Sequence, residues 1–556
     1  MIVKDLIQKF PQQDLPRPQQ KETLNKLTNF LNSNKKFAVC NLPTGSGKSH
    51  IAMTCANATN DIDLERKDLI ESYEIFRQSN SSSPSACEVS FEEKKTYGAF
   101  ILTVTKNLQD QYKNLFSDSI LLKGKNNYQC NVDLNSTVDG APCIFAPELK
   151  KKCFSQNKCS FYNDRKLGLQ NKNTITNYKA YLSLPNFLKR RELLICDEAS
   201  NLEEELISFY SLTVSYSALQ VEEIVFKKIL TDDTVEAYRW LNDINIQIEN
   251  KILDLKQKFD LLKSKKNNNF DALVQKYGTR YSKLSQLLKS LNNVITHWHT
   301  CQYIIESKTS QEITFVPLNI KPLTDQIFNN HDKVIFMSAT ISNHHVFTKT
   351  LGISAEDYFY IESPSSFNPE KSPIYCSSKY SLSYQNLEKF LPHVLDMVIE
   401  ICKNHKGEKG LIHTHTHNIT QALKKKIKND QRFLFREHGF SNEEIIETHK
   451  SLKDLDSIIV SPSMDSGVSL DDDLGRFQII IKAPFLPLGS KRIKKIFDKN
   501  PEYYISKMLD TLIQMCGRCT RSEKDHSITY ILDGSATKAI KKYKNTLPSH
   551  FLNRFK

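Results

Sequence analysis

A glycine-rich segment of the chain has the residue types that bind nucleotide phosphates. Residues 42–49 read Leu-Pro-Thr-Gly-Ser-Gly-Lys-Ser and lie between a short apolar run and a stretch of helical character. In such a loop the backbone N–H groups surround the phosphates, Lys48 reaches the β and γ phosphates, and the Ser49 hydroxyl binds Mg²⁺ at a helix N-terminus. The alternative is an ordinary flexible loop. The candidate phosphate-binding residues are Thr44, Gly45, Ser46, Gly47, Lys48 and Ser49.

An acidic pair follows a second apolar run. The segment from Leu193 to Cys196 has the composition of a buried strand and ends directly at Asp197 and Glu198. At the end of a strand, Asp197 would bind Mg²⁺, and Glu198 would orient or deprotonate an attacking water. An Asp-Glu pair on its own is equally typical of an acidic helix cap, so the catalytic interpretation depends on the loop at Lys48.

Near the C-terminal end of the sequence, two arginines are spaced to act on the same phosphate. Arg518 and Arg521 are three positions apart and therefore share one face of a helix. Arginines directed at the γ-phosphate stabilise the charge that develops during transfer, and Gln514 would sense the bound nucleotide. The alternative is an exposed basic helical turn. Another apolar run ends in Ser338-Ala339-Thr340, which we expect to couple hydrolysis to movement.

In this order, the segments resemble the motor motifs of superfamily 2 helicases: motif I at Lys48, motif II at Asp197, motif III at Ser338 and motif VI at Gln514. The resemblance covers nearly the whole chain. It departs from the family pattern at Ser200, where motif II usually has a histidine.

The same resemblance implies further site residues. Arg17-Pro18-Gln19-Gln20 is similar to the adenine-recognising element of these helicases, with Gln20 as the base contact. The segment from Thr103 to Gln111 resembles motif Ia, which grips a phosphodiester backbone. A segment that resembles motif V adds Gly467 and Asp471 to the predicted nucleotide site.

Four cysteines lie between motifs Ia and II, in a short lysine-rich stretch with little apolar content. They are Cys130, Cys143, Cys153 and Cys159. Four thiolates in a region too small to build a core indicate a domain that is held together by a metal centre. Zinc bound by four cysteines remains an alternative to an iron–sulfur cluster, because spacing alone does not separate the two. A set of buried free cysteines is the third interpretation.

The residues before the first of these cysteines extend the resemblance. The segment from Lys123 to Cys130 is similar to the Lys-Gly-x-x-Asn-Tyr-x-Cys start of the four-cysteine domain in XPD/DinG helicases. This resemblance implies that the four cysteines bind a [4Fe–4S] cluster. Tyr128, Phe154, Phe161 and Tyr162 either stack on nucleic-acid bases or pack around the cluster.

The composition restricts the class of protein. A chain of 556 residues is longer than one hydrophobic core normally organises, so several domains are expected. Its hydrophobic content of 39% supports folding. The net charge of +13 favours a polyanionic partner. No signal peptide, disulfide framework or apolar run of membrane length is apparent, so we expect an intracellular protein with reduced cysteines and no membrane partner.

Apolar runs that alternate with helical stretches predict an α/β fold with parallel sheets. The resemblance implies two RecA-like motor domains, the first interrupted by an Fe–S cluster domain and by a helical arch domain. In the region of the arch, apolar residues recur at three- and four-residue steps, which predicts helix throughout and a long antiparallel helical pair. The predicted boundaries are 1–120, 166–205 and 315–350 for the first motor domain, 121–165 for the cluster domain, 206–314 for the arch and 351–556 for the second motor domain.

These features together predict an ATP-dependent, Mg²⁺-requiring DNA helicase. By resemblance, it would move 5′ to 3′ on single-stranded DNA and separate forked or 5′-tailed duplexes, or RNA-containing hybrids, with the cluster domain as a wedge. Two other classes remain open. One is an ATPase stimulated by single-stranded DNA that remodels nucleoprotein complexes, and the other is a non-catalytic nucleic-acid-binding protein with a degenerate motor.

Overall fold

The fold is described from a computed structural model of the 556-residue chain. The residues that it describes are 3–11, 15–63, 67, 70, 97–134, 136–141, 143, 150, 152–153, 156, 158–229, 231–264, 270–428, 430–436, 441–453, 455–464, 470, 472–520 and 525–556, without the side chains of 262–276.

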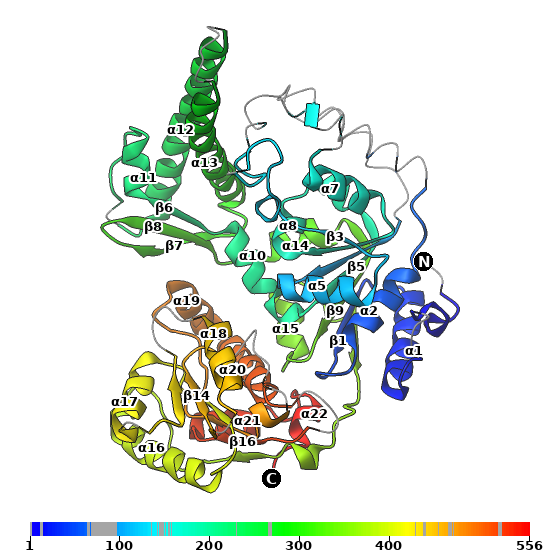
Figure 1. Cartoon of the computed structure of the whole chain (residues 1–556), viewed down its shortest axis with the longest axis vertical. Helices are drawn as coiled ribbons and strands as arrows, with labels where there is room; N and C mark the ends of the chain where they lie inside the picture. The colour runs from blue at the N-terminus through cyan, green and yellow to red at the C-terminus, as the bar shows by residue number, and fades with distance from the viewer. Residues whose placement is uncertain are drawn as a thin grey trace.

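The first part of the molecule is built on a seven-stranded parallel sheet (Figure 1). Its strand order is β10-β1-β9-β5-β2-β4-β3, so the strands that precede the phosphate loop and the acidic pair are separated by a single strand. The strands are β1 (Phe37–Asn41), β2 (Ala99–Thr103), β3 (Ile120–Leu122), β4 (Asn173–Asn177), β5 (Arg191–Asp197), β9 (His331–Ser338) and β10 (Tyr358–Glu362).

Both faces of this sheet are buried, which is why its strands are continuous apolar runs. In β1, Val39 packs into one apolar cluster, whereas Ala38 and Cys40 pack into the cluster on the opposite face. The helices of this unit are α1 (Pro18–Asn32), α2 (Lys48–Asn57), α5 (Lys106–Leu115), α7 (Ser160–Gln170), α8 (Tyr178–Leu182), α9 (Asn186–Lys189), α10 (Leu202–Tyr210), α14 (Lys321–Phe328) and α15 (His344–Thr350).

The arch combines a helical pair with a small sheet. Helices α12 (Thr234–Ser264) and α13 (Phe270–His297) lie side by side and project away from the rest of the molecule (Figure 1). At their base, a three-stranded antiparallel sheet is formed by β6 (Leu212–Ser215), β7 (Tyr303–Lys308) and β8 (Glu312–Pro317), beside α11 (Tyr216–Val221). The prediction of helix throughout this region is therefore wrong. The three strands are short, and β6 pairs with residues almost a hundred positions later, a contact that local periodicity does not reveal.

The second unit is a six-stranded parallel sheet in the order β11-β16-β15-β12-β14-β13. Its strands are β11 (Ile374–Cys376), β12 (Gly410–His413), β13 (Phe433–Phe435), β14 (Ile458–Ser461), β15 (Phe477–Ile480) and β16 (Ile528–Ile531). Its helices are α16 (Leu387–Asn404), α17 (His417–Ile427), α18 (Asn442–Ser451), α19 (Lys491–Lys499), α20 (Pro501–Cys516), α21 (Gly534–Tyr543) and α22 (Ser549–Leu552).

The first sheet extends beyond the boundary expected at residue 350. Strand β10 pairs in parallel with β1, with Tyr358 opposite Phe37 and Glu362 opposite Asn41. The chain passes to the second unit only after this strand. With two parallel sheets in all, the structure has the predicted fold class.

A buried carboxylate connects the two units. Glu203 lies on α10 in the first unit, and Arg492, Tyr503 and Lys507 come from α19 and α20 in the second. Oε1 of Glu203 accepts hydrogen bonds from Nη2 of Arg492 at 2.9 Å and from the hydroxyl of Tyr503 at 2.8 Å. Nζ of Lys507 lies 2.9 Å from Oε2. Burial alone would raise the pKa of Glu203, but the two cations hold it at about 2, so this carboxylate is ionised at neutral pH.

Helix α20 contacts the first unit again just after motif III. The backbone N–H of Ser342 donates to Oδ1 of Asp510 at 2.7 Å, and its hydroxyl donates to the carbonyl of Ser506 at 3.1 Å. Asn343 donates to Glu502 at 3.1 Å. The helix is thus held along its length against the first unit.

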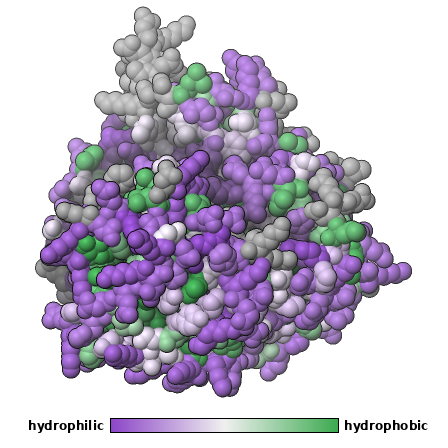
Figure 2. Space-filling view, turned by 60° about the horizontal axis from the view of Figure 1, so that its bottom comes forward, coloured by the Kyte–Doolittle hydropathy of each residue, from purple (hydrophilic) through white to green (hydrophobic). Residues whose placement is uncertain are grey.

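One face of the molecule is mostly polar. Figure 2 shows a face on which hydrophilic residues dominate and hydrophobic residues are scattered. Among the described residues, no helix is both long enough and apolar enough to cross a membrane.

We predict that Glu203→Gln destabilises the protein by about 3–5 kcal/mol at pH 7, because it leaves Lys507 and Arg492 buried without a counter-charge. The neighbouring Glu204 is exposed, so Glu204→Gln is the matched control and should change stability by less than about 0.5 kcal/mol. Urea denaturation at a series of pH values measures both.

The pH dependence follows from the lowered pKa of Glu203, which moves from 4.5 to about 2 on folding. The stabilisation is complete above pH 4.5 and is lost as the pH falls towards 2. The difference between the wild type and Glu203→Gln should therefore shrink in acid. Equal denaturation midpoints for the two variants at pH 7 would contradict the role assigned to Glu203.

Candidate functional site

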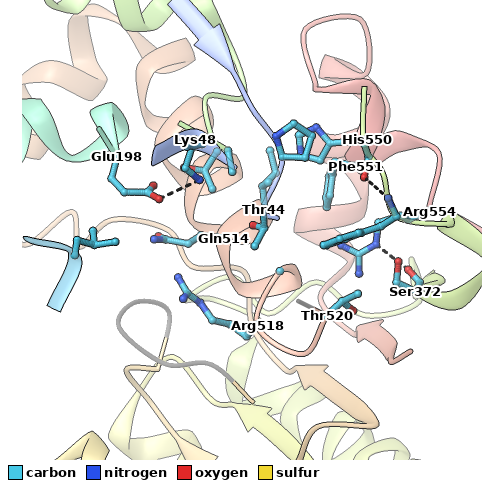
Figure 3. Close-up of a pocket in the computed structure, with 18 of the residues that line it drawn as sticks. Thr44, Lys48, Glu198, Ser372, Gln514, Arg518, Thr520, His550, Phe551 and Arg554 are labelled. Carbon is cyan, nitrogen blue, oxygen red and sulfur yellow. Dashed lines mark hydrogen bonds and ion pairs between the residues drawn. The ribbon is translucent and has the colours of Figure 1, made fainter. Parts of the chain in front are cut away.

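A cleft of about 980 Å³ separates the two units, and both contribute to its walls. The first unit supplies Thr44, Lys48 and Glu198, and the second supplies Gln514 and Arg518 (Figure 3). These residues are far apart in the sequence. The structure therefore brings the predicted motifs I, II and VI to one cavity.

The glycine-rich loop adopts a conformation that requires its glycines. Gly45 and Gly47 have φ angles of 78° and 77°, and Gly47 is the N-cap of α2. A Cβ at Gly47 would lie 2.2 Å from Nε2 of Gln20 and 2.8 Å from Nη2 of Arg17. Nη2 of Arg17 also donates to the carbonyl of Gly45 at 2.9 Å. The predicted adenine-recognising residues therefore lie directly against the predicted phosphate loop.

The two motifs of the first unit meet through an ion pair. Nζ of Lys48 lies 3.2 Å from Oε1 of Glu198, with both side chains partly exposed to the cleft. Glu198 has left-handed backbone angles, with φ 50° and ψ 47°. This conformation is uncommon for a residue with a side chain, and it is typical of functional sites. It turns the chain sharply after β5, where the Glu198 carboxylate reaches the cleft.

Asp197 lies at the end of β5 and is 2% exposed. Its Oδ2 accepts a hydrogen bond from the hydroxyl of Tyr112 at 2.9 Å, and its Oδ1 accepts one from the backbone N–H of Glu198 at 3.0 Å. Burial, followed by the charge of Glu198, raises the pKa of Asp197 to about 6, although Lys48 opposes this shift. A carboxylate that is costly to ionise here would be stabilised by a bound cation.

The wall from the second unit comes from the end of α20. Gln514 lies in the last turn of this helix, and Arg518 follows it. A Cβ at Gly517 would lie 3.8 Å from Oγ1 of Thr44, so the turn after α20 closely approaches the glycine-rich loop. Three predicted site residues lie outside the described residues: Arg521, Gly467 and Asp471.

Ser200, which replaces the usual histidine of motif II, links motif II to motif III. Its hydroxyl lies 3.1 Å from the hydroxyls of both Ser338 and Thr340. Three small hydroxyl side chains thus form a connected group at the ends of β5 and β9. Motif III is thus hydrogen-bonded to the residue two positions after Glu198.

The cleft has a further wall that the sequence did not indicate. His550 and Arg554, in and just after α22, line the end of the cavity opposite Glu198 (Figure 3). Arg554 donates to the carbonyls of Ser372 at 2.7 Å and Cys516 at 3.1 Å, so it caps the C-terminal end of α20. Burial lowers the pKa of His550 to about 4, so the ring is neutral at pH 7.

A second, smaller cavity is lined by all four predicted metal ligands: Cys130, Cys143, Cys153 and Cys159. Burial raises the pKa of Cys143 to about 11, and the proximity of the other three thiols contributes to this shift. The described residues contain no group of three or more His, Cys, Asp or Glu side chains that is already arranged to hold a metal ion. The four thiols therefore converge on one cavity without forming a closed coordination shell, and their donor chemistry suits an iron–sulfur cluster or zinc.

The aromatic residues near these cysteines pack together. Phe161 and Tyr162 are buried, with ring centroids 5.2 Å apart, and Tyr128 contacts Phe161 edge-on at 5.4 Å. The hydroxyl of Tyr128 donates to Asp164 at 3.0 Å. These contacts favour packing around the cysteine cavity over base stacking. Phe154 lies outside the described residues.

Comparisons with known proteins agree with this geometry. Residues 398–554 match the family model of a helicase C-terminal domain. The sequence as a whole matches no curated protein. An apo structure of XPD has a TM-score of 0.55 at 14% identity, and a structure of the XPD helicase has 0.53 at 15% identity; each comparison covers 94% of this chain and 98% of the other.

The chain has the fold of these XPD structures, and its C-terminal part matches a helicase domain. The predicted resemblance and the predicted fold class are thereby confirmed. An XPD-like fold also accounts for the two long excursions from the first sheet, which leave between β3 and β4 and between β5 and β9.

Two cleft residues and one buried tyrosine behind the acidic pair have no signal in the sequence. Tyr112 lies on the buried face of α5, three residues after Gln109. In the sequence, this spacing is typical of a core residue. His550 lies in a short helix near the end of the chain and Arg554 lies just after it, outside any motif. Each of the three residues reaches its place only through tertiary packing.

We predict that Gly47→Ala abolishes detectable nucleotide binding. The added Cβ would need a left-handed backbone and would collide with Gln20 and Arg17. Gly489 is the control, because a Cβ there meets nothing within 4 Å. Titration with a fluorescent ADP analogue measures both, and binding by Gly47→Ala as tight as by Gly489→Ala would refute the loop assignment.

Proposed function

We propose that this chain is an ATP-driven DNA helicase that moves along single-stranded DNA. The observation that supports it most directly is the cleft in which Lys48 and Glu198 of one unit face Gln514 and Arg518 of the other. A triphosphate in this cleft would touch both units, so its hydrolysis would change their separation. That is the requirement for converting hydrolysis into movement.

Each wall has a chemical task in this proposal. The backbone N–H groups of the loop from Thr44 to Gly47 bind the phosphates, and the Lys48 ammonium pairs with the β and γ phosphates. Phosphate oxygens compete with Glu198 for Lys48, which releases the Glu198 carboxylate to orient and deprotonate the attacking water. Arg518, from the opposite wall, stabilises the charge on the transferred phosphoryl group.

Ser49 and Asp197 are the residues that would hold Mg²⁺. The cation would supply the positive charge that neutralises the β and γ oxygens during transfer. The fit rests on the chemistry of the donors. Asp197 is a buried carboxylate whose two oxygens each have an unused lone pair. The phenol of Tyr112, which donates to it, also lies near Ser49 in the first turn of α2.

Helix α20 is the mechanical element of this motor. It carries Gln514 at its end, and its other turns contact the first unit through Glu203, Ser342 and Asn343. These contacts resist movement of the helix when its Gln514 end is displaced by the nucleotide. Closure of the cleft would therefore rotate the second unit about them.

The nucleic-acid substrate follows from charge and resemblance. The net charge of +13 favours a polyanion, and the start of α5, where Thr105 is the N-cap and Lys106 follows, lines the same cleft. Single-stranded DNA, 5′-to-3′ movement, and forked or 5′-tailed duplexes are the substrate, polarity and targets that we propose. RNA-containing hybrids present the same phosphates.

We further propose that Cys130, Cys143, Cys153 and Cys159 hold a [4Fe–4S] cluster. The cluster would supply covalent links between four chain segments where the apolar core is small. The core there consists of Val138, Phe161 and Tyr162. The four-cysteine domain would then be rigid enough to separate strands as a wedge.

Lys48→Ala should reduce single-strand-stimulated ATP turnover by at least about 100-fold, because the phosphates lose their main positive partner. Binding of single-stranded DNA should remain. The exposed Lys349, on α15, serves as the matched control, and Lys349→Ala should turn over ATP normally. Normal turnover by Lys48→Ala would refute the proposed site.

Strand displacement from a 5′-tailed duplex decides between a helicase and a remodelling ATPase. ATP turnover without strand displacement would favour the remodelling ATPase. Absence of turnover in the wild type would leave a non-catalytic nucleic-acid-binding protein.

For Cys153→Ser we predict loss of bound iron and of unwinding, with part of the ATPase activity retained. The expected loss of iron follows from removing one of four thiolate ligands. Cys376→Ser, a half-buried thiol in the second unit, should keep its iron. The wild type and both variants are purified anaerobically and compared by iron, sulfide and zinc analysis and by visible absorption. Unchanged iron in Cys153→Ser would contradict the ligand assignment, and zinc in place of iron would contradict the cluster.

A further inference from the structure

One tyrosine outside the motor motifs touches the metal-binding carboxylate of the proposed site. Tyr112 lies on α5, is fully buried, and donates from its hydroxyl to Oδ2 of Asp197 at 2.9 Å. The side chain of Ser49 lies near the same phenol. A single hydroxyl group therefore lies between the two side chains that would hold Mg²⁺.

We propose that Tyr112 is a positioning residue that sets the orientation of Asp197, relative to Ser49, for the divalent cation. This inference rests on the proposed function, because it concerns the cation of the nucleotide site. It adds a residue that belongs to none of the motifs.

The geometry gives the physical reason. A carboxylate at the end of a strand rotates about its side-chain bonds unless both oxygens are held. In Asp197, the backbone N–H of Glu198 holds Oδ1 and Tyr112 holds Oδ2. Each oxygen retains a second lone pair for a cation. Partners of this kind, which orient a metal ligand without touching the metal, typically contribute 10- to 100-fold to metal affinity.

The phenol is itself held firmly. Tyr112 belongs to the apolar cluster beneath the glycine-rich loop, and its ring lies against Phe116, with centroids 6.2 Å apart. The hydroxyl is thus presented by a packed ring on a helix. Tyr112→Phe keeps this packing and removes only the hydroxyl.

The chain offers a matched control at the same aspartate. Tyr178 is also fully buried and donates from its hydroxyl to the backbone carbonyl of Asp197 at 3.0 Å. Tyr178→Phe therefore also removes a phenol hydroxyl that donates to Asp197, but the lost bond is to the backbone carbonyl and not to the carboxylate. A purely structural role predicts equal effects of the two substitutions, whereas positioning of the carboxylate predicts an effect of Tyr112→Phe alone.

The test is binding of a fluorescent ADP analogue to the full-length protein, titrated with Mg²⁺ from a chelated starting point. We expect Tyr112→Phe to raise the half-saturating Mg²⁺ concentration roughly tenfold or more. Nucleotide binding without Mg²⁺ should change less than about twofold. Tyr178→Phe should match the wild type, and thermal denaturation without Mg²⁺ should show that both variants are folded.

An unchanged Mg²⁺ requirement in folded Tyr112→Phe would overturn the inference while leaving the proposed function intact. An equal shift in both variants would also overturn it, in favour of a structural role. If the wild type itself bound no nucleotide, the proposed function would fail, and the inference with it.

Discussion

A single buried carboxylate, Glu203, relates the two walls of the cleft to each other. It lies shortly after the acidic pair Asp197-Glu198 in the first unit, on α10, and is shared by Arg492, Tyr503 and Lys507 in the second. A buried charge of this kind is tolerated only while its partners stay in place, because removing one leaves an uncompensated charge in a poorly polarisable environment. The position of α20, and so of the residues at its end, depends on that condition.

The residues around the predicted nucleotide site also depend on buried polar groups that hold one another in place. Strands of a parallel sheet end along one edge, and the loops that follow β1, β5 and β9 therefore meet there. At this edge, left-handed backbone at Gly47 and Glu198 turns the chain, and buried hydroxyl groups complete the hydrogen bonding of Asp197. Polar groups that are individually costly to bury thus satisfy one another.

The described part of the four-cysteine region has few apolar contacts. Its apolar cluster is small, and its four thiols surround a cavity instead of packing into a core. By contrast, the arch shares one continuous apolar cluster with the first sheet, from Phe100 to Trp240 and Trp298. The arch is thus packed against the first sheet, whereas the described part of the cysteine region has only a small apolar cluster of its own.

The sequence by itself indicated the central strands of the two parallel sheets, the α/β class and the residues at the strand ends, because apolar runs, glycines and acidic pairs are local signals. It also indicated that the four cysteines belong together. Only the tertiary structure decided the pairing of β10 with β1, the antiparallel sheet of the arch, the contact of Tyr112 with Asp197, and the approach of Arg554 to the cleft. Those features depend on contacts between residues that are distant along the chain. A tyrosine that bonds to a carboxylate 85 positions away has the same local pattern as one that merely fills a core.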